Sequence, residues 1–221
     1  MTPWIRASLT AALLLQIVWH GSISGLDARA KALEDPPGLT ETRLASLDET
    51  ILASRLTMLY LQSFDIQPGI IIPFRDLDYE KVKAWLELSQ RLDERDAYPL
   101  FAASNLYLGV EDPGRKKAML DFIYGEFLKD PEERWPWMAK GALAAQYGLH
   151  DRNLALKYAE ALGRAPNAPA WAVELPLFVM ENMNEADSAK IWLGGLIAGG
   201  RIRDGNELRF LGKTLENRQQ K

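Results

Sequence analysis

Few residues in this 221-residue chain are suited to acid–base or metal chemistry. There is no cysteine, and the only histidines are His20 and His150. The lack of cysteine excludes disulfides, thiol catalysis and cysteine-based zinc sites. A Ser-His-Asp triad would have to use His150, because His20 lies at the edge of an apolar segment.

Two clusters of titratable residues are candidates for chemical sites. His150 and Asp151 place a possible general base beside a carboxylate, but adjacent residues rarely point at one another on a helix. Asp151 can instead cap the helix that follows, so we interpret the pair as a solvated turn. Glu181, Glu185 and Asp187 surround an Asn-rich turn that lacks the alternating acids and central glycine of a calcium loop. We therefore predict no catalytic residue, no cofactor and no metal.

Aromatic residues offer a better case for binding. Trp135-Pro136-Trp137 could form a platform for a ligand, or its rings could wedge between neighbouring helices. Pro136 suits the first turn of a helix. Tyr98 and Tyr107 could line a peptide groove. We take Trp135, Trp137, Tyr98 and Tyr107 as the candidate partner-binding surface.

Composition is that of a folded protein with an acidic balance. The chain is 48% hydrophobic and 25% charged, with a formal charge of −4. Residues 1–26 hold Arg6 and no acid, so the rest carries 25 basic and 30 acidic groups, or −5. Nucleic acid is excluded as the main partner because no basic footprint is present. The acidity favours basic patches on a protein partner.

The N-terminal segment is apolar. Ala7–Trp19 spans 13 residues, the length of a signal-peptide core. Extended to Leu26 it reaches about 20 residues, the length that spans a bilayer. Trp4 and Trp19 bracket the run as interfacial tryptophans do. We favour an uncleaved anchor over a cleaved signal or a buried core helix.

The favoured orientation leaves the N-terminus in the cytoplasm and exports the rest of the chain. A short stretch followed by an apolar run is the signal-anchor pattern, although the Lys and Arg counts do not themselves support it. In a bacterium the body would be periplasmic and the protein a single-pass protein of the inner membrane. Residues 1–26 are thus the predicted membrane anchor or signal segment, and the membrane is one predicted partner.

A linker and a helical domain follow. Residues 27–47 contain Asp35-Pro36-Pro37-Gly38, which forbids a continuous helix and predicts a linker. Residues 48–221 form the predicted helical-repeat domain. Its first helix starts near Asp48, a good N-cap residue, and ends before Gln67. Five residues of that helix fall at helical spacing: Ile51, Leu52, Leu56, Leu59 and Tyr60.

The next segment switches from extended chain to helix. Residues 69–74 could be a short strand, but no strand partner is visible in the sequence, so we predict an extended apolar loop on the first helix. Asp76 or Asp78 then caps a helix. Its inward residues are predicted to be Val82, Trp85, Leu86 and Leu88.

From residue 92 the sequence suggests paired helices with a recurring period. Units open at residues 92–99, 129–136 and 164–171, and each breaks at a polar turn, at 111–114, 149–152 and 182–185. Pro131 and Pro166 are 35 residues apart, a period typical of paired-helix solenoids. A final helix is predicted from Asn206 to Leu215. In the third unit, Gly194-Gly195 is expected to allow close helix approach and Gly199-Gly200 to end a helix.

These units resemble the tetratricopeptide-repeat (TPR) family over roughly residues 79–200. With Pro166 as the closing proline, Ala142 and Ala161 fall on the small residues and Tyr158 on the large aromatic. The preceding unit departs from the pattern, because Ile123 and Glu126 stand where an aromatic and a small residue are expected. The resemblance implies an all-α fold, specifically an α-solenoid of antiparallel helix pairs. It also implies binding of a protein or peptide on a concave surface, without a catalytic activity.

The functional expectation is a membrane-tethered, TPR-like adaptor or scaffold that binds another protein or peptide. Two alternatives stay open: a helical lyase or hydrolase of the cell wall, and an accessory subunit of a membrane complex. An enzyme of the first kind needs a carboxylic acid with a raised pKa in a cleft, and nothing in the sequence marks one. A subunit of a membrane complex would need small residues in the apolar segment so that helices pack closely, and few are present.

Overall fold

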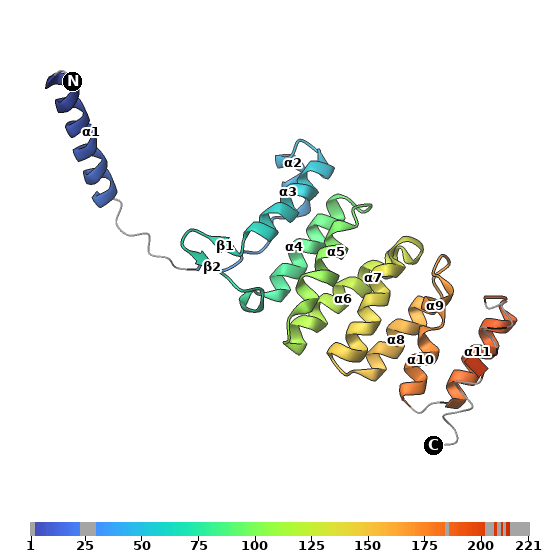
Figure 1. The fold of residues 1–221 in the computed structure, drawn as a ribbon. Coiled ribbons are helices and arrows are strands. Elements are labelled where there is room, and N and C mark those ends of the chain that lie inside the picture. The colour runs from blue at the N-terminus through green and yellow to red at the C-terminus, as the bar shows by residue number, and fades with distance from the viewer. Residues whose placement is uncertain are drawn as a thin grey trace.

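The computed structural model describes residues 3–22, 30–183 and 186–201, together with 206, 209, 211 and 212. Over these residues the chain is mostly helical, which confirms the predicted all-α class (Figure 1). Strand is confined there to one antiparallel pair of two-residue strands.

From α2 onward the elements follow one another with short connections. In chain order they are α1 (Pro3–Ser22), α2 (Leu39–Ala45), α3 (Thr50–Ser63), β1 (Ile66–Gln67), β2 (Ile70–Ile71), η1 (Phe74–Asp76), α4 (Tyr79–Leu92), α5 (Tyr98–Asn105), η2 (Tyr107–Gly109), α6 (Pro113–Lys129), α7 (Pro131–Leu143), the π-helical turn η3 (Ala144–Gly148), α8 (Arg152–Gly163), α9 (Ala170–Val173), α10 (Leu175–Asn182) and α11 (Ala186–Ala198).

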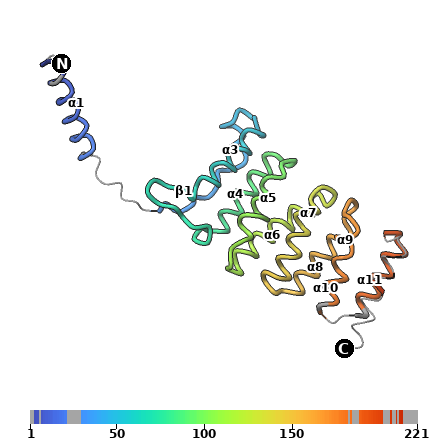
Figure 2. The backbone as a smooth tube through the Cα atoms, viewed as in Figure 1, coloured from blue at the N-terminus to red at the C-terminus, as the bar shows by residue number. Residues whose placement is uncertain are grey.

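From α3 onward each helix packs mainly against its neighbours in the chain. α3 packs on α4, α6 on α7, α7 on α8 and α10 on α11. Contacts also join α4 to α6 and α5 to α7. The backbone trace shows the same progression from one end of the body to the other (Figure 2). Segments that lie close in sequence therefore build each local part of the core.

Aspartate side chains cap four of these helices, and two of the caps are predicted from the sequence: Asp151 and, of the candidates Asp76 and Asp78, Asp78. Asp78 accepts hydrogen bonds from the Glu80 and Lys81 amides at the start of α4. The N-caps of α6, α7 and α8 accept from one amide each, at 2.8 to 3.2 Å; these caps are Asp112, Asp130 and Asp151. Each side chain satisfies an amide that has no partner within its helix.

The core lies between these helices and agrees with the predicted inward faces. The residues predicted to face inward from α4 are all buried: Val82, Trp85, Leu86 and Leu88. Ala142 and Tyr158, which carried the resemblance in the second unit, are buried as well. The packing is built from aliphatic, methionine and aromatic side chains, with few buried charges.

The first helix of the body exists as predicted, but it enters the core through Met58 and Leu61 and not through the residues picked out by their spacing. The residues that α3 buries are Ala53, Ser54, Thr57, Met58 and Leu61. The predicted periodic set faces solvent instead: Ile51, Leu52, Leu56, Leu59 and Tyr60. The reason is position, because α3 packs on α4 through the side that carries Ala53, Ser54, Thr57, Met58 and Leu61, which leaves the predicted set on the other side.

The segment after α3 is a hairpin, so the prediction of an extended loop without a strand partner is wrong. Ile66 pairs with Ile71, and Gln67 pairs with Ile70. The intervening Pro68-Gly69 makes the turn, with φ of 80° at Gly69. Proline followed by a left-handed glycine is the combination that a type II turn requires.

The predicted linker needs correction over its described part. Residues 30–38 are non-helical, as the Pro-Pro-Gly run requires, but they are not a free spacer. Leu33 is buried in the core, and the Trp85 indole donates a 2.9 Å hydrogen bond to the Glu34 carbonyl. Residues 39–45 then form α2, which contacts α3 and α4. Packing on the body therefore begins before residue 48.

Of the two predictions made for glycines, one is confirmed and the other is wrong. Gly200 has φ of 65° just past the end of α11, as predicted. Gly194 and Gly195 do not mediate close approach, since a Cβ added to either would meet no described atom within 4 Å. The close approach occurs at Gly163, where an added Cβ would lie 2.8 Å from the Trp192 ring. Most of the predicted helix from Asn206 to Leu215 lies outside the described residues.

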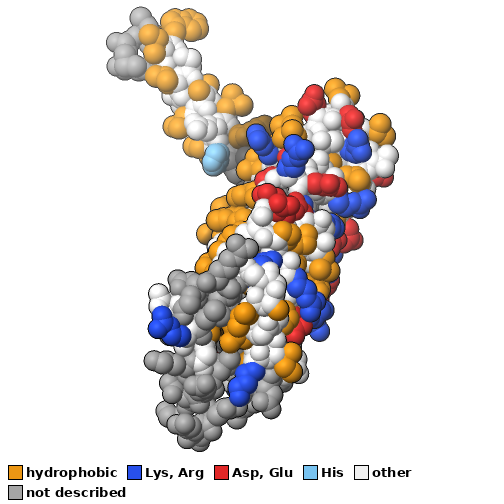
Figure 3. Space-filling model, turned by 90° about the vertical axis from the view of Figure 1, so that its right-hand side faces the viewer, with side chains coloured by type: hydrophobic (Ala, Val, Ile, Leu, Met, Phe, Trp, Pro, Cys, Tyr) orange, Lys and Arg blue, Asp and Glu red, His pale blue; other side chains and the backbone are white. Residues whose placement is uncertain are grey.

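The N-terminal helix α1 contributes nothing to this core. Every side chain described in it is exposed, so the alternative of a buried core helix is wrong. Figure 3 shows hydrophobic side chains along its visible face, whereas acidic and basic side chains intermix on the body. Among the residues described, no helix combines the length and apolar character needed to cross a membrane.

Candidate partner-binding site

The four predicted surface aromatics fall in three different places. Tyr98 is 39% exposed at the start of α5, and Trp137 is half-buried on α7. Trp135 turns toward α9, where its ring meets the Trp171 ring edge-on at 5.9 Å. Tyr107 is only 1% exposed, so its assignment to the binding surface is wrong.

Tyr107 is a core residue in the turn η2 that follows α5. Its carbonyl accepts a 3.1 Å hydrogen bond from the Tyr79 hydroxyl, and its ring packs against Tyr79 and Phe74. Burial raises the pKa of the Tyr79 phenol to about 12 and moves the pKa of the Tyr107 phenol further upward. These hydroxyls therefore stay neutral and support packing rather than recognition.

Three rings form a continuous row across α5 and α7, which we call the aromatic ridge: Tyr98, Phe101 and Trp137. The Tyr98 and Phe101 rings are nearly parallel, with centroids 6.0 Å apart. Phe101 meets Trp137 edge-on at 6.2 Å. Phe101 is 41% exposed, so the ridge presents ring surface to solvent as well as to its own members.

Polar contacts fix the helices that carry the ridge. The Gln62 amide on α3 donates to the Tyr98 hydroxyl. The Lys140 ammonium on α7 donates to the side-chain carbonyl of Asn105 on α5. These two bonds link α3 to α5 and α5 to α7.

A cavity of about 410 Å³ opens beside the ridge at Trp137. It lies where the turn between α4 and α5 meets the start of α7. Its lining residues are Glu94, Arg95, Asp96, Ala97, Leu100, Asp130, Glu133, Arg134 and Trp137. Four acids face two arginines in this set, so the cavity has an excess of negative charge.

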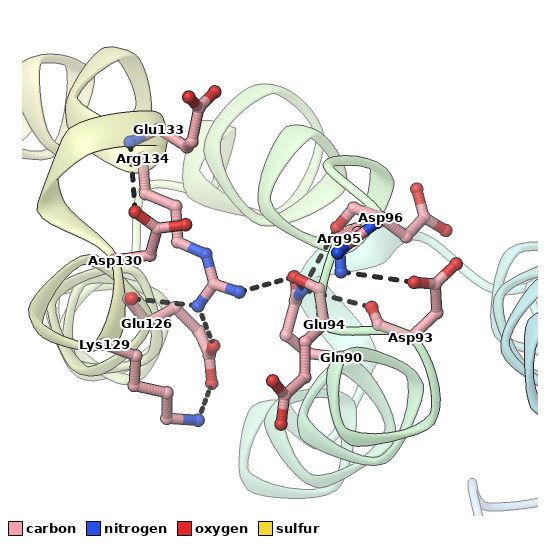
Figure 4. A network of polar contacts seen from close by, with 10 residues as sticks. All are labelled: Gln90, Asp93, Glu94, Arg95, Asp96, Glu126, Lys129, Asp130, Glu133 and Arg134. Carbon is pink, nitrogen blue, oxygen red and sulfur yellow. Dashed lines mark hydrogen bonds and ion pairs between the residues drawn. The ribbon is translucent and has the colours of Figure 1, made fainter. Parts of the chain in front are cut away.

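One arginine holds the walls of the cavity together. Arg134 is buried, and its guanidinium donates to the Glu126 carboxylate at 2.6 Å and to the Glu126 carbonyl at 3.0 Å (Figure 4). It also donates to the Glu94 carbonyl at 2.6 Å. Because Glu94 lies between α4 and α5, this single side chain ties α6, α7 and that turn into one unit.

A second buried side chain shapes the turn itself. The Gln90 amide nitrogen lies within hydrogen-bond distance of the carbonyls of Asp93, Glu94 and Asp96. The Asp96 carboxylate accepts from the Tyr98 amide at 2.9 Å and so sets the start of α5. The turn is therefore held by its own polar groups, which positions the ridge residue Tyr98.

Two carboxylates of the cavity remain available for an incoming group. Asp96 and Asp130 are engaged by the amides that they cap. Within the described part of the chain, neither the Glu94 nor the Glu133 carboxylate has a hydrogen-bond or ion-pair partner. In Figure 4 the Glu133 carboxylate points away from the Arg134 network. Acid next to a half-buried indole suits a cationic group, which gains both ion pairing and cation–π attraction.

Sequence reasoning missed most of these residues. Phe101 escaped notice although it lies three positions after Tyr98, a spacing that places two rings on one helix face. Glu126 was identified only as a departure from the TPR pattern. A buried acid in place of a small residue requires a buried cation, and that requirement could have indicated Arg134.

Of the remaining candidate clusters, the one at His150 and Asp151 is a helix-capping turn. Asp151 caps α8, while His150 is exposed with φ of 54°, in agreement with the predicted solvated turn. Glu185 lies outside the described residues, as does the side chain of Asp187. Among the residues that were placed, no three His, Asp or Glu side chains gather as a metal site would require.

Comparison of the chain with protein-family models, with curated proteins and with solved structures finds no match. The functional argument therefore rests on the chemistry of the ridge and the cavity.

Proposed function

We propose that this protein is an adaptor that binds another protein or peptide through the aromatic ridge and the adjoining acidic cavity. The observation that carries the proposal is the placement of Trp137 between exposed ridge rings and the available carboxylates of Glu94 and Glu133. A basic side chain of the partner would enter the cavity, and its neighbouring residues would cover Tyr98 and Phe101. Interfaces favour this combination of aromatic anchors with a polar rim.

The proposed architecture is a TPR-like α-solenoid of antiparallel helix pairs. Its support is the neighbour-to-neighbour packing from α3 to α11 and the contacts that link α4 to α6 and α5 to α7. In such a fold one layer of helices lines the binding surface. The ridge lies on the layer that contains α3, α5 and α7, where a solenoid of this kind would hold its partner.

The proposal includes a membrane tether through α1, with the body exported to the periplasm of a bacterium. Support comes from the exposed apolar side chains of α1 and from Trp4 and Trp19 near its two ends. A tether confines the ridge to one surface, and the raised local concentration strengthens a weak interaction.

Short fluorescent peptides test the recognition step. We expect an extended peptide with one Lys or Arg beside apolar residues to bind, and its Lys→Gln counterpart to bind about tenfold more weakly. Trp137→Ala and the double variant Glu94→Gln/Glu133→Gln should each weaken binding of the basic peptide by a similar factor. Anisotropy gives the affinity, and added salt should reduce it.

Trp171→Ala is the matched control, because Trp171 is an exposed tryptophan outside the ridge and the cavity. It should leave affinity within about twofold of the unmodified chain, as expected for surface changes away from an interface. Equal losses for Trp137→Ala and Trp171→Ala would contradict the site. Turnover of a cell-wall glycan that Glu133→Gln abolishes would replace the adaptor proposal with the enzyme alternative.

A further inference from the structure

Exposed apolar side chains concentrate at the N-terminal end of the body. We call this set the N-terminal apolar face, and it comprises Ile51, Leu52, Leu56 and Leu59 on α3 together with Ile66 and Ile71 on the hairpin. Every member is more than half exposed. Arg55 is the only charged residue in α3, so the exposed side of this helix is almost entirely apolar.

This face lies on the outer side of the end helix, a surface that is ordinarily polar in a stacked-helix protein. α3 packs on α4 through its opposite side, which makes it the end helix of the stack (Figure 1). Terminal helices of such arrays need a polar outer face for solubility. An apolar end on a body whose face in Figure 3 mixes acidic and basic side chains indicates that the end is covered in the working protein.

The course of the chain indicates what covers it. The Lys31 amide donates to the Gln67 side chain at 2.8 Å, and the Gln67 amide donates back to the Lys31 carbonyl at 3.1 Å. These bonds fix residue 31 against the hairpin. Only residues 23–29 separate α1 from Ala30, and so short a segment spans at most about 25–30 Å. Any membrane that binds α1 therefore lies within that reach of the hairpin.

We propose that the N-terminal apolar face rests on the lipid surface and forms a second membrane contact beside α1. This inference depends on the proposed tether and extends it, because two contacts fix the direction in which the body stands. Leu52, Leu56 and Ile71 enter the acyl boundary, while Arg55 extends its charge toward the headgroups. The ridge on α5 and α7, further along the stack, is then held away from the bilayer.

Because the chain contains no cysteine, single labels can report depth in the full-length protein. The protein is reconstituted in phosphatidylcholine vesicles with an environment-sensitive fluorophore at Leu13→Cys, Leu56→Cys or Leu128→Cys. Leu56 and Leu128 are matched, at 54% and 55% exposed, but Leu128 lies on α6. Nitroxide lipids should quench the labels at positions 13 and 56 strongly and the label at 128 little.

A charge variant provides the second measurement. With the label at Ile71→Cys, Leu52→Glu/Leu56→Glu should reduce quenching by lipid nitroxides at least about fivefold, because it removes apolar contact and adds charge. Leu128→Glu should leave that quenching unchanged. Circular dichroism of each variant shows that the helices are intact.

The outcomes separate the two proposals. Quenching at 13 without quenching at 56 overturns the second contact and leaves the tether standing. No quenching at either position overturns both. Efficient disulfide formation between Leu56→Cys chains without vesicles, with no quenching at position 56 on vesicles, assigns the face to a second copy of the chain and also overturns the inference.

Discussion

Replacement of Arg134 by alanine should destabilise the fold more than any change on the surface of the cavity. The substitution removes three hydrogen bonds, two to Glu126 and one to the Glu94 carbonyl. It also leaves the Glu126 carboxylate, whose side chain is 4% exposed, without its buried partner. Breaking a buried ion pair in this way costs about 3–5 kcal/mol. Urea unfolding of the full chain in mild detergent, followed by circular dichroism, measures the loss.

Lys129 provides the matched control, because it pairs with the same carboxylate at 2.5 Å but its side chain is 60% exposed. Lys129→Ala should therefore cost no more than about 1 kcal/mol. The double variant Glu126→Leu/Arg134→Met should recover most of the stability, since it leaves no unpaired buried charge. Losses for Arg134→Ala and Lys129→Ala that agree within about 1 kcal/mol would refute the reasoning.

Three further predictions follow from packing, burial and the site. Gly163→Ala should destabilise the fold by about 1–3 kcal/mol through its clash with Trp192, whereas Gly194→Ala, in open space within a helix, should be neutral or stabilising by up to about 1 kcal/mol; thermal unfolding compares them, and equal effects would contradict the packing. Because burial raises the pKa of Tyr79 from 10.0 to about 12, its contribution to stability is complete below pH 10 and is lost as pH rises toward 12; Tyr79→Phe should flatten that part of the stability profile, and an unchanged profile would contradict the assignment. Phe101→Ala should weaken binding of the basic peptide by about tenfold in anisotropy titrations while changing helix content little, and undiminished affinity would exclude the ridge from the interface.

Local chemistry made much of the fold predictable from the sequence. Asp78 and Asp151 could be identified as caps because a short acidic side chain before an apolar periodic run satisfies the first free amides of a helix. The inward face of α4 followed from the spacing of Val82, Trp85 and Leu86. These features depend on residues within a few positions of one another, so a single sequence contains the information.

Features that depend on distant partners were not predictable in the same way. The apolar spacing of Leu52 and Leu56 is equally consistent with a core-facing and an outward-facing stripe, and only the one-sided packing of α3 on α4 decides between them. Tyr107 resembles a surface aromatic in sequence, yet a bond to Tyr79, 28 residues away, places it in the core. The cavity likewise requires Glu94 and Arg134 to meet across 40 residues.

Site-specific photocrosslinking in native cells tests the adaptor proposal most directly. A benzophenone side chain at Phe101 should form an adduct with one reproducible partner protein, and Trp137→Ala should abolish that adduct while Trp171→Ala preserves it. A benzophenone at Leu128, which is exposed on α6, should not capture that partner. Equal capture from positions 101 and 128, or an adduct at 101 that survives Trp137→Ala, would contradict recognition through the ridge and its acidic cavity.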